Sequence, residues 1–168
     1  MLRLFKPDGY YRALTAIPIA EFLKRDISGV LFDLDNTITT WNNLVCDESV
    51  IAWFRQLHEA GIKSCILSNN HAPRIEPVAK ILGSFFVAEA RKPSAQGYYR
   101  GMQVLGTTEA NTMMVGDQLL TDIYGAKKIG LACFLVVPID TRQEYWFTTL
   151  VNRRLERLLL RRLRLVAK

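Results

Sequence analysis

Cysteine is scarce in this 168-residue sequence, and its arrangement argues against disulfide bonds. The three cysteines, Cys46, Cys65 and Cys133, are scattered and form no Cys-x-x-Cys pair. An odd, scattered set is not typical of a disulfide framework. We therefore expect a protein of a reducing compartment, with the cytoplasm as its location.

Long apolar stretches are also missing. The longest run, Leu131–Ile139, has nine residues including Pro138, whereas a membrane-spanning helix needs about 20. Charges and a proline interrupt the first eight residues, so we expect no signal peptide. A composition of 49% hydrophobic and 23% charged residues is typical of one globular domain and excludes a disordered chain.

An excess of basic residues is absent from most of the chain, although the formal net charge is +6. Residues 152–168 contain seven Arg or Lys and one Glu, which leaves fifteen basic and fifteen acidic residues in 1–151. A domain that is basic all over, as expected for coating nucleic acid, is therefore not supported. We divide the chain into a neutral domain, 1–151, and a basic segment, 152–168.

Apolar runs and amphipathic stretches alternate along the domain. This alternation predicts an α/β fold, in which a parallel sheet is covered by helices on both faces. A helix covering the sheet is also expected near the N-terminus, over Tyr10–Phe22. The predicted strands are Ile27–Leu34, Ile62–Leu67, Phe85–Ala88, Thr112–Val115 and Leu131–Val137, and the predicted helices between them are Glu48–Ala60, Pro73–Leu82, Ser94–Leu105 and Leu119–Ile129.

Polar residues of a chemically useful kind follow four successive predicted strands. The carboxyl ends of parallel strands share one edge of a sheet, where active sites of such folds lie. Each residue taken alone is typical of a turn or a surface loop, but the joint pattern favours a catalytic site. The residues are Asp33, Asp35 and Thr37 after the first strand, Ser68 and Asn69 after the second, Lys92 after the third, and Asp117 and Asp122 after the fourth.

Clustered carboxylates repel one another, and a divalent cation removes that repulsion. Oxygen ligands of this kind suit Mg²⁺, which keeps several waters for a substrate phosphate to displace. Asp33 could then attack phosphorus and form an aspartyl-phosphate. Asp35, two residues later, could protonate the leaving oxygen and then activate water. The sequence therefore predicts a Mg²⁺-dependent phosphomonoester hydrolase.

The same residues carry a family resemblance that spans about residues 27–137. The segment Asp33–Thr37 resembles the DxDx[TV] first motif of the haloacid dehalogenase (HAD) superfamily. Ser68 and Lys92 match its second and third motifs, and Gly116–Asp122 matches its acidic fourth motif. The surrounding sequence is similar to the small YqeG-like phosphatases of bacteria, a group similar in turn to mitochondrial phosphatidylglycerophosphate phosphatases.

The resemblance implies a HAD-like, Rossmann-like three-layer sandwich and a role for each matched residue. Asp33 would be the nucleophile and a Mg²⁺ ligand, and Asp35 the general acid and base with its main-chain carbonyl as a further ligand. Asp117 would bind Mg²⁺ directly, and Asp122 would act through water or a lysine. The phosphoryl group would be bound by Thr37, which also positions Asp35, and by Ser68, Asn69 and Lys92.

Members of this superfamily carry selectivity domains, called caps, after the first motif or between the second and third. Here 30 residues separate Thr37 from Ser68 and 23 separate Ser68 from Lys92. One helix and one strand use most of each interval, so we expect no cap domain. The open site would accept a bulky substrate, such as a protein, a nucleic acid or a lipid headgroup, or be closed by a neighbouring subunit in an oligomer.

The basic segment 152–168 is predicted to be an amphipathic helix. Arg153, Arg157, Arg161, Arg164 and Lys168 recur at helical spacing, with leucines mostly on another face. The helix could pack on the domain with its arginines in water. It could also lie on an anionic membrane at its inner face, or contact RNA or the ribosome.

The substrate that we expect is phosphatidylglycerophosphate or another bulky phosphate ester. Two other functions remain open from the sequence. One is a phospho-aspartate switch, which uses a similar set of side chains around a parallel sheet. The other is an RNA- or ribosome-associated adaptor built on a HAD fold.

Overall fold

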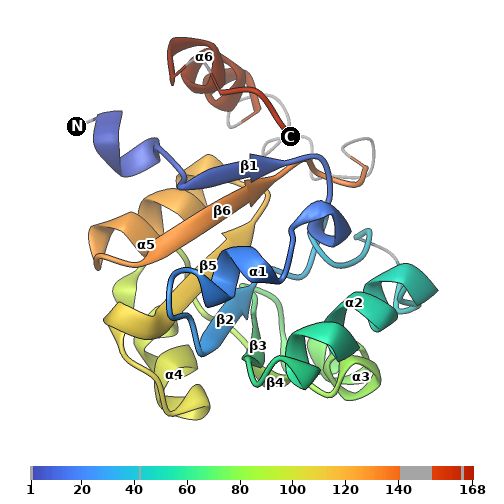
Figure 1. Cartoon of the computed structure of the whole chain (residues 1–168). Helices are drawn as coiled ribbons and strands as arrows, with labels where there is room; N and C mark the ends of the chain where they lie inside the picture. The colour runs from blue at the N-terminus through green and yellow to red at the C-terminus, as the bar shows by residue number, and fades with distance from the viewer. Residues whose placement is uncertain (1, 42, 141–152, 164) are drawn as a thin grey trace.

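A computed structural model of the chain describes residues 2–41, 43–140, 153–163 and 165–168, with the backbone alone at 153–157 (Figure 1). Six strands form one sheet in the order β1-β6-β5-β2-β3-β4, and all neighbouring strands are parallel. This arrangement confirms the predicted α/β fold. The strands are β1 (Gly9–Tyr11), β2 (Gly29–Phe32), β3 (Lys63–Leu67), β4 (Phe85–Val87), β5 (Thr112–Gly116) and β6 (Ala132–Val136).

Helices cover both faces of this sheet, as Figure 1 shows. One face is packed against α1 (Ala20–Leu23), α2 (Glu48–Glu59) and α3 (Ala72–Leu82). The other is packed against α4 (Ala95–Leu105), α5 (Tyr124–Lys128) and α6 (Arg153–Leu163). Short turns complete the described chain: η1 (Leu2–Phe5), η2 (Leu14–Ala16), η3 (Glu109–Asn111) and η4 (Leu119–Ile123).

The two apolar cores follow from the two-residue period of the strands. In β2, Val30 and Phe32 belong to the core under α1–α3, whereas Leu31 belongs to the core under α4–α6. All three side chains are completely buried, and each such burial stabilises the fold by about 1.5–3 kcal/mol. Both faces of a central strand are therefore apolar, as expected for a parallel sheet.

Two glycines within α4 weaken the sequence-based prediction of a helix, and the structure explains them. A Cβ atom on Gly97 would lie 2.4 Å from the Ala90 carbonyl oxygen, and one on Gly101 would lie 2.6 Å from Leu31 Cδ2. The helix thus approaches the sheet more closely than a side chain would permit. Gly97 also packs directly against the backbone of Ala90, two residues before Lys92.

The prediction of one helix over Tyr10–Phe22 is wrong. Tyr10 and Tyr11 belong to the edge strand β1, where they pair with Leu135 and Val136 of β6. Pro18 interrupts the remaining segment, which forms the short η2 and α1. Phe22 of α1 is nevertheless fully buried on one face of the sheet.

The predicted helix over 152–168 is too long. α6 ends at Leu163, and Lys168 instead pairs with β1: its amide donates to the Tyr10 carbonyl and its carbonyl accepts from the Arg12 amide, both at 2.9 Å. Leu159 and Leu160 of α6 pack against the domain. The predicted basic positions Arg153, Arg157 and Arg164, and the boundary at 151/152, lie outside the residues whose side chains are described.

The connections that could carry an additional domain are short. Within the described residues, the connection from β2 to β3 holds α2 with one loop, and the connection from β3 to β4 holds α3. Because these connections are short, nothing in the described chain forms a second domain over the carboxyl ends of the strands.

None of the described helices has both the length and the hydropathy to cross a membrane.

Candidate active site

A tight loop at the end of β2 presents Asp33 and Asp35. The Asp33 amide donates to the Val115 carbonyl at 2.9 Å, so this residue still continues the sheet. The chain then reverses at Asn36, which has a φ of 67°, a left-handed conformation that asparagine tolerates well. The Asn36 amide closes the turn by donating to the Thr39 carbonyl at 2.7 Å. This turn fixes the backbone just after Asp35 at the carboxyl end of β2.

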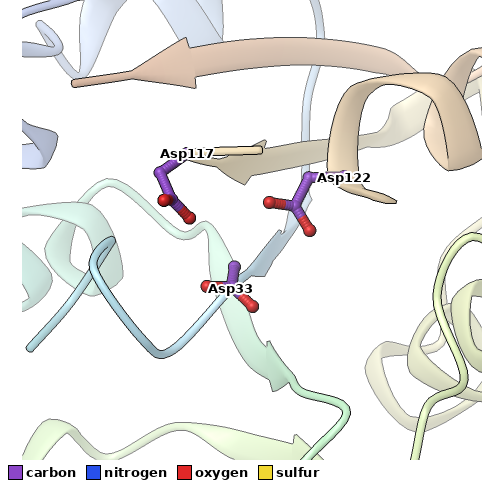
Figure 2. A group of neighbouring side chains, drawn as sticks. All are labelled: Asp33, Asp117 and Asp122. Atoms are coloured by element: carbon purple, nitrogen blue, oxygen red, sulfur yellow. The ribbon is translucent and has the colours of Figure 1, made fainter. Parts of the chain in front are cut away.

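Three buried carboxylates converge from neighbouring strands, as Figure 2 shows. Asp33 follows β2, Asp117 follows β5, and Asp122 lies in η4. One oxygen from each lies within 4.8 Å of the others. The structure therefore brings together three of the acids that the sequence analysis singles out.

The turn η4 is a π-helical turn, and it aims Asp122 back at the site. The amides of Asp122 and Ile123 both donate to the Gln118 carbonyl, at 3.0 and 3.2 Å. Such turns are frequent at functional sites. Gly116 makes room for the carboxylate, because a Cβ atom there would lie 2.3 Å from Asp122 Oδ2. The predicted helix Leu119–Ile129 thus begins as η4 and continues as α5.

Lys92 joins two of the three acids. Its Nζ donates to Asp33 Oδ1 at 2.6 Å and to Asp122 Oδ1 at 2.7 Å. Asn69 holds the lysine backbone: its Oδ1 accepts from the Lys92 amide at 2.7 Å, and its Nδ2 donates to the Lys92 carbonyl at 3.2 Å. Asn69 therefore fixes where the ammonium group lies.

The electrostatics of this cluster favour a bound cation. Burial raises the pKa of Asp33 to about 7, against the opposing effect of Lys92 and with a further rise from Asp122. Burial also disfavours the charged form of Lys92, but the carboxylates of Asp122 and Asp33 outweigh it and raise the pKa of the lysine. With all three carboxylates ionised, the cluster and its one ammonium carry two net negative charges, which a divalent cation would neutralise.

Asp35 is held by two residues that the sequence reasoning did not assign to the site. Arg74 Nη2 donates to Asp35 Oδ1 at 2.8 Å, and Asn70 Nδ2 donates to Asp35 Oδ2 at 2.6 Å. Burial raises the pKa of Asp35, while Arg74 and Asn70 lower it in part. A positive charge in the first turn of a helix is unfavourable, because the N-terminal end of the helix dipole is also positive. Arg74 lies in the first turn of α3, and this unfavourable position is the signal in the sequence that indicates a specific acidic partner.

A pocket of about 380 Å³ opens over these groups. Thr37 and Asp117 are not among its lining residues, and Thr37 Oγ1 lies 3.3 Å from Asp117 Oδ1. The structure thus places Thr37 against Asp117 and not on the pocket wall, where a residue predicted to bind the phosphoryl group is expected. The pocket is lined by Asp33, Asp35, Trp41, Ser68, Asn69, Asn70, Lys92, Gln118 and Thr121.

Comparison with known proteins decides the family. The family profile described as haloacid dehalogenase-like hydrolase matches residues 40–130, which is more than half of the chain. The chain belongs to this family. Its first motif, at Asp33–Thr37, lies just before the matched range.

A curated relative extends the match to nearly the whole chain. "Probable phosphatase YqeG" of Bacillus subtilis (strain 168) is 33% identical over 158 residues, covering 94% of this HAD-family chain and 91% of the relative. Only ten residues lie outside that match, so it includes the first motif. The prediction of a HAD-superfamily phosphatase of the YqeG-like group is therefore confirmed.

Solved structures confirm the fold. An uncharacterized protein from Listeria monocytogenes serotype 4b superposes with a TM-score of 0.56 at 21% identity, covering 80% of this chain and 99% of that one. A 3-deoxy-D-manno-octulosonate 8-phosphate phosphatase from Yersinia pestis superposes with a TM-score of 0.52 at 18% identity, covering 69% and 66%. At these identities the likeness concerns the fold alone.

Proposed function

We propose that this HAD-family phosphatase is Mg²⁺-dependent and hydrolyses phosphomonoesters through a phosphorylated Asp33. The observation that carries the proposal is the convergence of Asp33, Asp117 and Asp122 within 4.8 Å, with Lys92 as their shared ammonium partner. A buried excess of two negative charges beside an open pocket suits a divalent cation and a phosphate. Asp33 and Asp117, with the main-chain carbonyl of Asp35, would hold the ion.

When bound, Mg²⁺ would supply positive charge for the phosphoryl oxygens. Ser68 and Lys92, both on the pocket wall, would bind those oxygens as well. A carboxylate oxygen of Asp33 attacks phosphorus while the bond from phosphorus to the ester oxygen breaks. Asp35 gives its proton to that leaving oxygen, and the alcohol departs.

The second half of the reaction returns the enzyme to its starting state. Asp35, now a carboxylate, takes a proton from an attacking water. The water oxygen bonds to phosphorus and the bond from phosphorus to Asp33 breaks, releasing inorganic phosphate. Ser68 and Lys92 hold the phosphoryl oxygens throughout, so only the groups in line with phosphorus change partners.

The proposal is tested with Asp33→Asn. The amide is a poor nucleophile, so we expect phosphate release to fall at least about a thousandfold. Acid-quenched wild-type protein should carry one acid-stable, hydroxylamine-labile phosphoryl group during turnover, and the variant none. Substantial activity in Asp33→Asn would contradict the mechanism. An adduct that persists for minutes would point to a phospho-aspartate switch.

For the substrate, we propose an ester with a bulky leaving group, with phosphatidylglycerophosphate as the first candidate. The support is the short chain connections around the pocket, which leave it open to a large molecule. Phosphate release should then be faster from phosphatidylglycerophosphate in anionic vesicles than from sugar phosphates or nucleotides. Faster turnover of a soluble phosphate would exclude the lipid.

We also propose that the basic segment brings the enzyme to an anionic membrane from the cytoplasmic side. Arg161 and Arg162 are exposed on α6, as are Leu158 one turn earlier in the same helix and Val166 three residues after its end. Each basic residue at such a surface contributes about 1 kcal/mol.

The double variant Arg161→Glu/Arg162→Glu should abolish cosedimentation with phosphatidylglycerol vesicles. A matched control, Arg55→Glu/Arg100→Glu, changes two exposed arginines on α2 and α4 and should retain it. Equal loss in both variants would indicate a nonspecific charge effect. Binding of RNA in preference to vesicles would favour the adaptor function instead.

A further inference from the structure

Arg74 lies at the acid/base residue without touching the pocket. Its Nη2 donates to Asp35 Oδ1 at 2.8 Å and to the Thr40 carbonyl at 2.9 Å. Asp35 lines the pocket, whereas Arg74 is not among the lining residues. Its hydrogen bonds therefore connect it to the pocket through Asp35 and the loop that carries Asp35.

The contacts of Arg74 constrain both the carboxylate and the chain that carries it. Nη2 ties one oxygen of Asp35 to the loop at Thr40, and Asn70 holds the other oxygen at 2.6 Å. With both oxygens engaged, rotation of the carboxylate about its last side-chain bond breaks at least one hydrogen bond. Asp35 is thus held in one orientation toward the pocket.

Packing alone does not account for an arginine at this position. The guanidinium is mostly buried, with a side chain that is 19% exposed. Its Nη1 is buried without a hydrogen-bond partner among the described residues. Burying such a group is unfavourable unless its charge is used, and the charge here faces the carboxylate that the proposed reaction uses as general acid.

We infer that Arg74 is a positioning residue that aims Asp35 at the leaving-group oxygen, and that it sets how well the enzyme handles poor leaving groups. The inference rests on the proposed function, in which Asp35 protonates that oxygen. An alkoxide needs the proton as its bond to phosphorus breaks, whereas p-nitrophenolate leaves as a stable anion. A badly aimed Asp35 therefore slows alkyl esters far more than p-nitrophenyl phosphate.

The test compares kcat on p-nitrophenyl phosphate with kcat on an alkyl phosphate that the wild-type enzyme turns over. Arg74→Met should lower the ratio of alkyl to aryl turnover about 10- to 100-fold, with little change in KM. Arg74→Lys keeps the charge but has one nitrogen for both acceptors, so a smaller fall is expected. Arg55→Met, which changes an exposed arginine on α2, is the matched control and should leave the ratio unchanged.

A ratio of two activities does not depend on how much of a variant is folded, so partial unfolding does not obscure the result. In the double variant Arg74→Met/Asp35→Asn the ratio should fall no further than in Asp35→Asn, because Arg74 acts through Asp35. An equal loss on both substrates, an unchanged ratio or a higher ratio in Arg74→Met would overturn the inference. High activity in Asp33→Asn would overturn the proposed function, whatever the Arg74 variants do.

Discussion

Asp33 occupies a position that suits its proposed role as nucleophile but lowers the stability of the folded protein. Its carboxyl group is buried, and two further acids lie within 4.8 Å. Lys92 offsets only part of this cost, because one ammonium serves both Asp33 and Asp122. Active-site groups commonly reduce the stability of the fold in this way, so replacing Asp33 should have opposite effects on activity and stability.

This conflict predicts a pH-dependent stability of the metal-free protein. The pKa of Asp33 rises from 3.8 to about 7 on folding, so between these values the folded state binds more protons than the unfolded state. The free energy of unfolding therefore falls as pH rises through this window and levels off above it. Asp33→Asn lacks this contribution.

Urea denaturation in EDTA at pH 5 and pH 8 measures the effect. The measured quantity is the free energy of unfolding of the wild type minus that of Asp33→Asn. This difference should be lower at pH 8 than at pH 5. Asp26→Asn removes an exposed carboxyl outside the site and serves as the control, with a constant difference from wild type expected. A wild type that gains stability over Asp33→Asn as pH rises would show that Asp33 is ionised more easily in the fold than in the unfolded chain.

Gly116 predicts a second effect at the scale of one residue. A Cβ atom in Gly116→Ala would lie 2.3 Å from Asp122 Oδ2, so the carboxylate must leave the position in which it accepts from Lys92. We expect at least a tenfold loss of activity and a higher Mg²⁺ concentration for half-maximal rate. In the control Gly61→Ala the new Cβ meets nothing within 4 Å, but the φ of 81° strains it; this variant should lose stability and keep its activity.

At the scale of elements, the pattern of the sequence predicts the central part of the fold well. Apolar strands that end in polar residues, such as Ile27–Leu34 before Asp35, are recognisable because both faces of a central strand are buried. The three-residue strand β1 is not recognisable in this way. Its identity depends on pairing with β6, more than 120 residues later in the chain, and local propensity carries no information about that partner.

The same distinction applies to the site. Asp33, Ser68 and Asp117 follow strands directly, and Lys92 lies in the loop after β4, so topology brings them to the same edge of the sheet. The sequence does not predict the contact of Arg74 with Asp35, because Arg74 lies in the first turn of α3 and not at the end of a strand. Side chains in a helix lean toward its N-terminus, but which strand end lies there depends on how α3 packs, and that is a property of the folded chain.

We expect the two glycines of α4 to differ in how much stability the protein loses when each is replaced by alanine. Alanine normally stabilises a helix interior by about 1 kcal/mol over glycine. In Gly97→Ala the new Cβ would meet the backbone oxygen of Ala90 at 2.4 Å, whereas in Gly101→Ala it would meet the end of the Leu31 side chain at 2.6 Å. The side chain can shift and the backbone cannot do so cheaply.

We therefore expect Gly97→Ala to lower the free energy of unfolding by about 2–3 kcal/mol, and Gly101→Ala by clearly less. Gly97→Ala should also reduce activity, because Ala90 lies two residues before Lys92. Urea denaturation and phosphate release measure both effects. Equal stability losses would mean that α4 moves as a rigid unit away from the sheet.

At the scale of the whole molecule, Lys168 at the C-terminal end pairs with β1, the strand at one edge of the sheet. The free side of β1 would leave backbone donors and acceptors open to another chain, which is a liability for any sheet. Lys168 covers part of this edge with two hydrogen bonds of 2.9 Å. Its Nζ also lies 6.0 Å from the centre of the Tyr11 ring. Figure 1 shows the C-terminus beside β1, so this end of the chain protects the edge as well as carrying charge.

Deleting residues 165–168 should therefore expose the β1 edge while leaving the site intact. Two lost backbone hydrogen bonds are expected to lower the free energy of unfolding by about 1–3 kcal/mol, and the open edge should promote concentration-dependent association, measured by light scattering. The side chain is not essential to this effect, so Lys168→Ala, which keeps both backbone bonds, should remain monodisperse and nearly as stable as wild type. If Lys168→Ala associated as strongly as the deletion, charge rather than edge pairing would keep the molecules apart. Activity per folded molecule should be the same in both variants, because the carboxylates of the site rest on β2 and β5, two strands or more away from the edge.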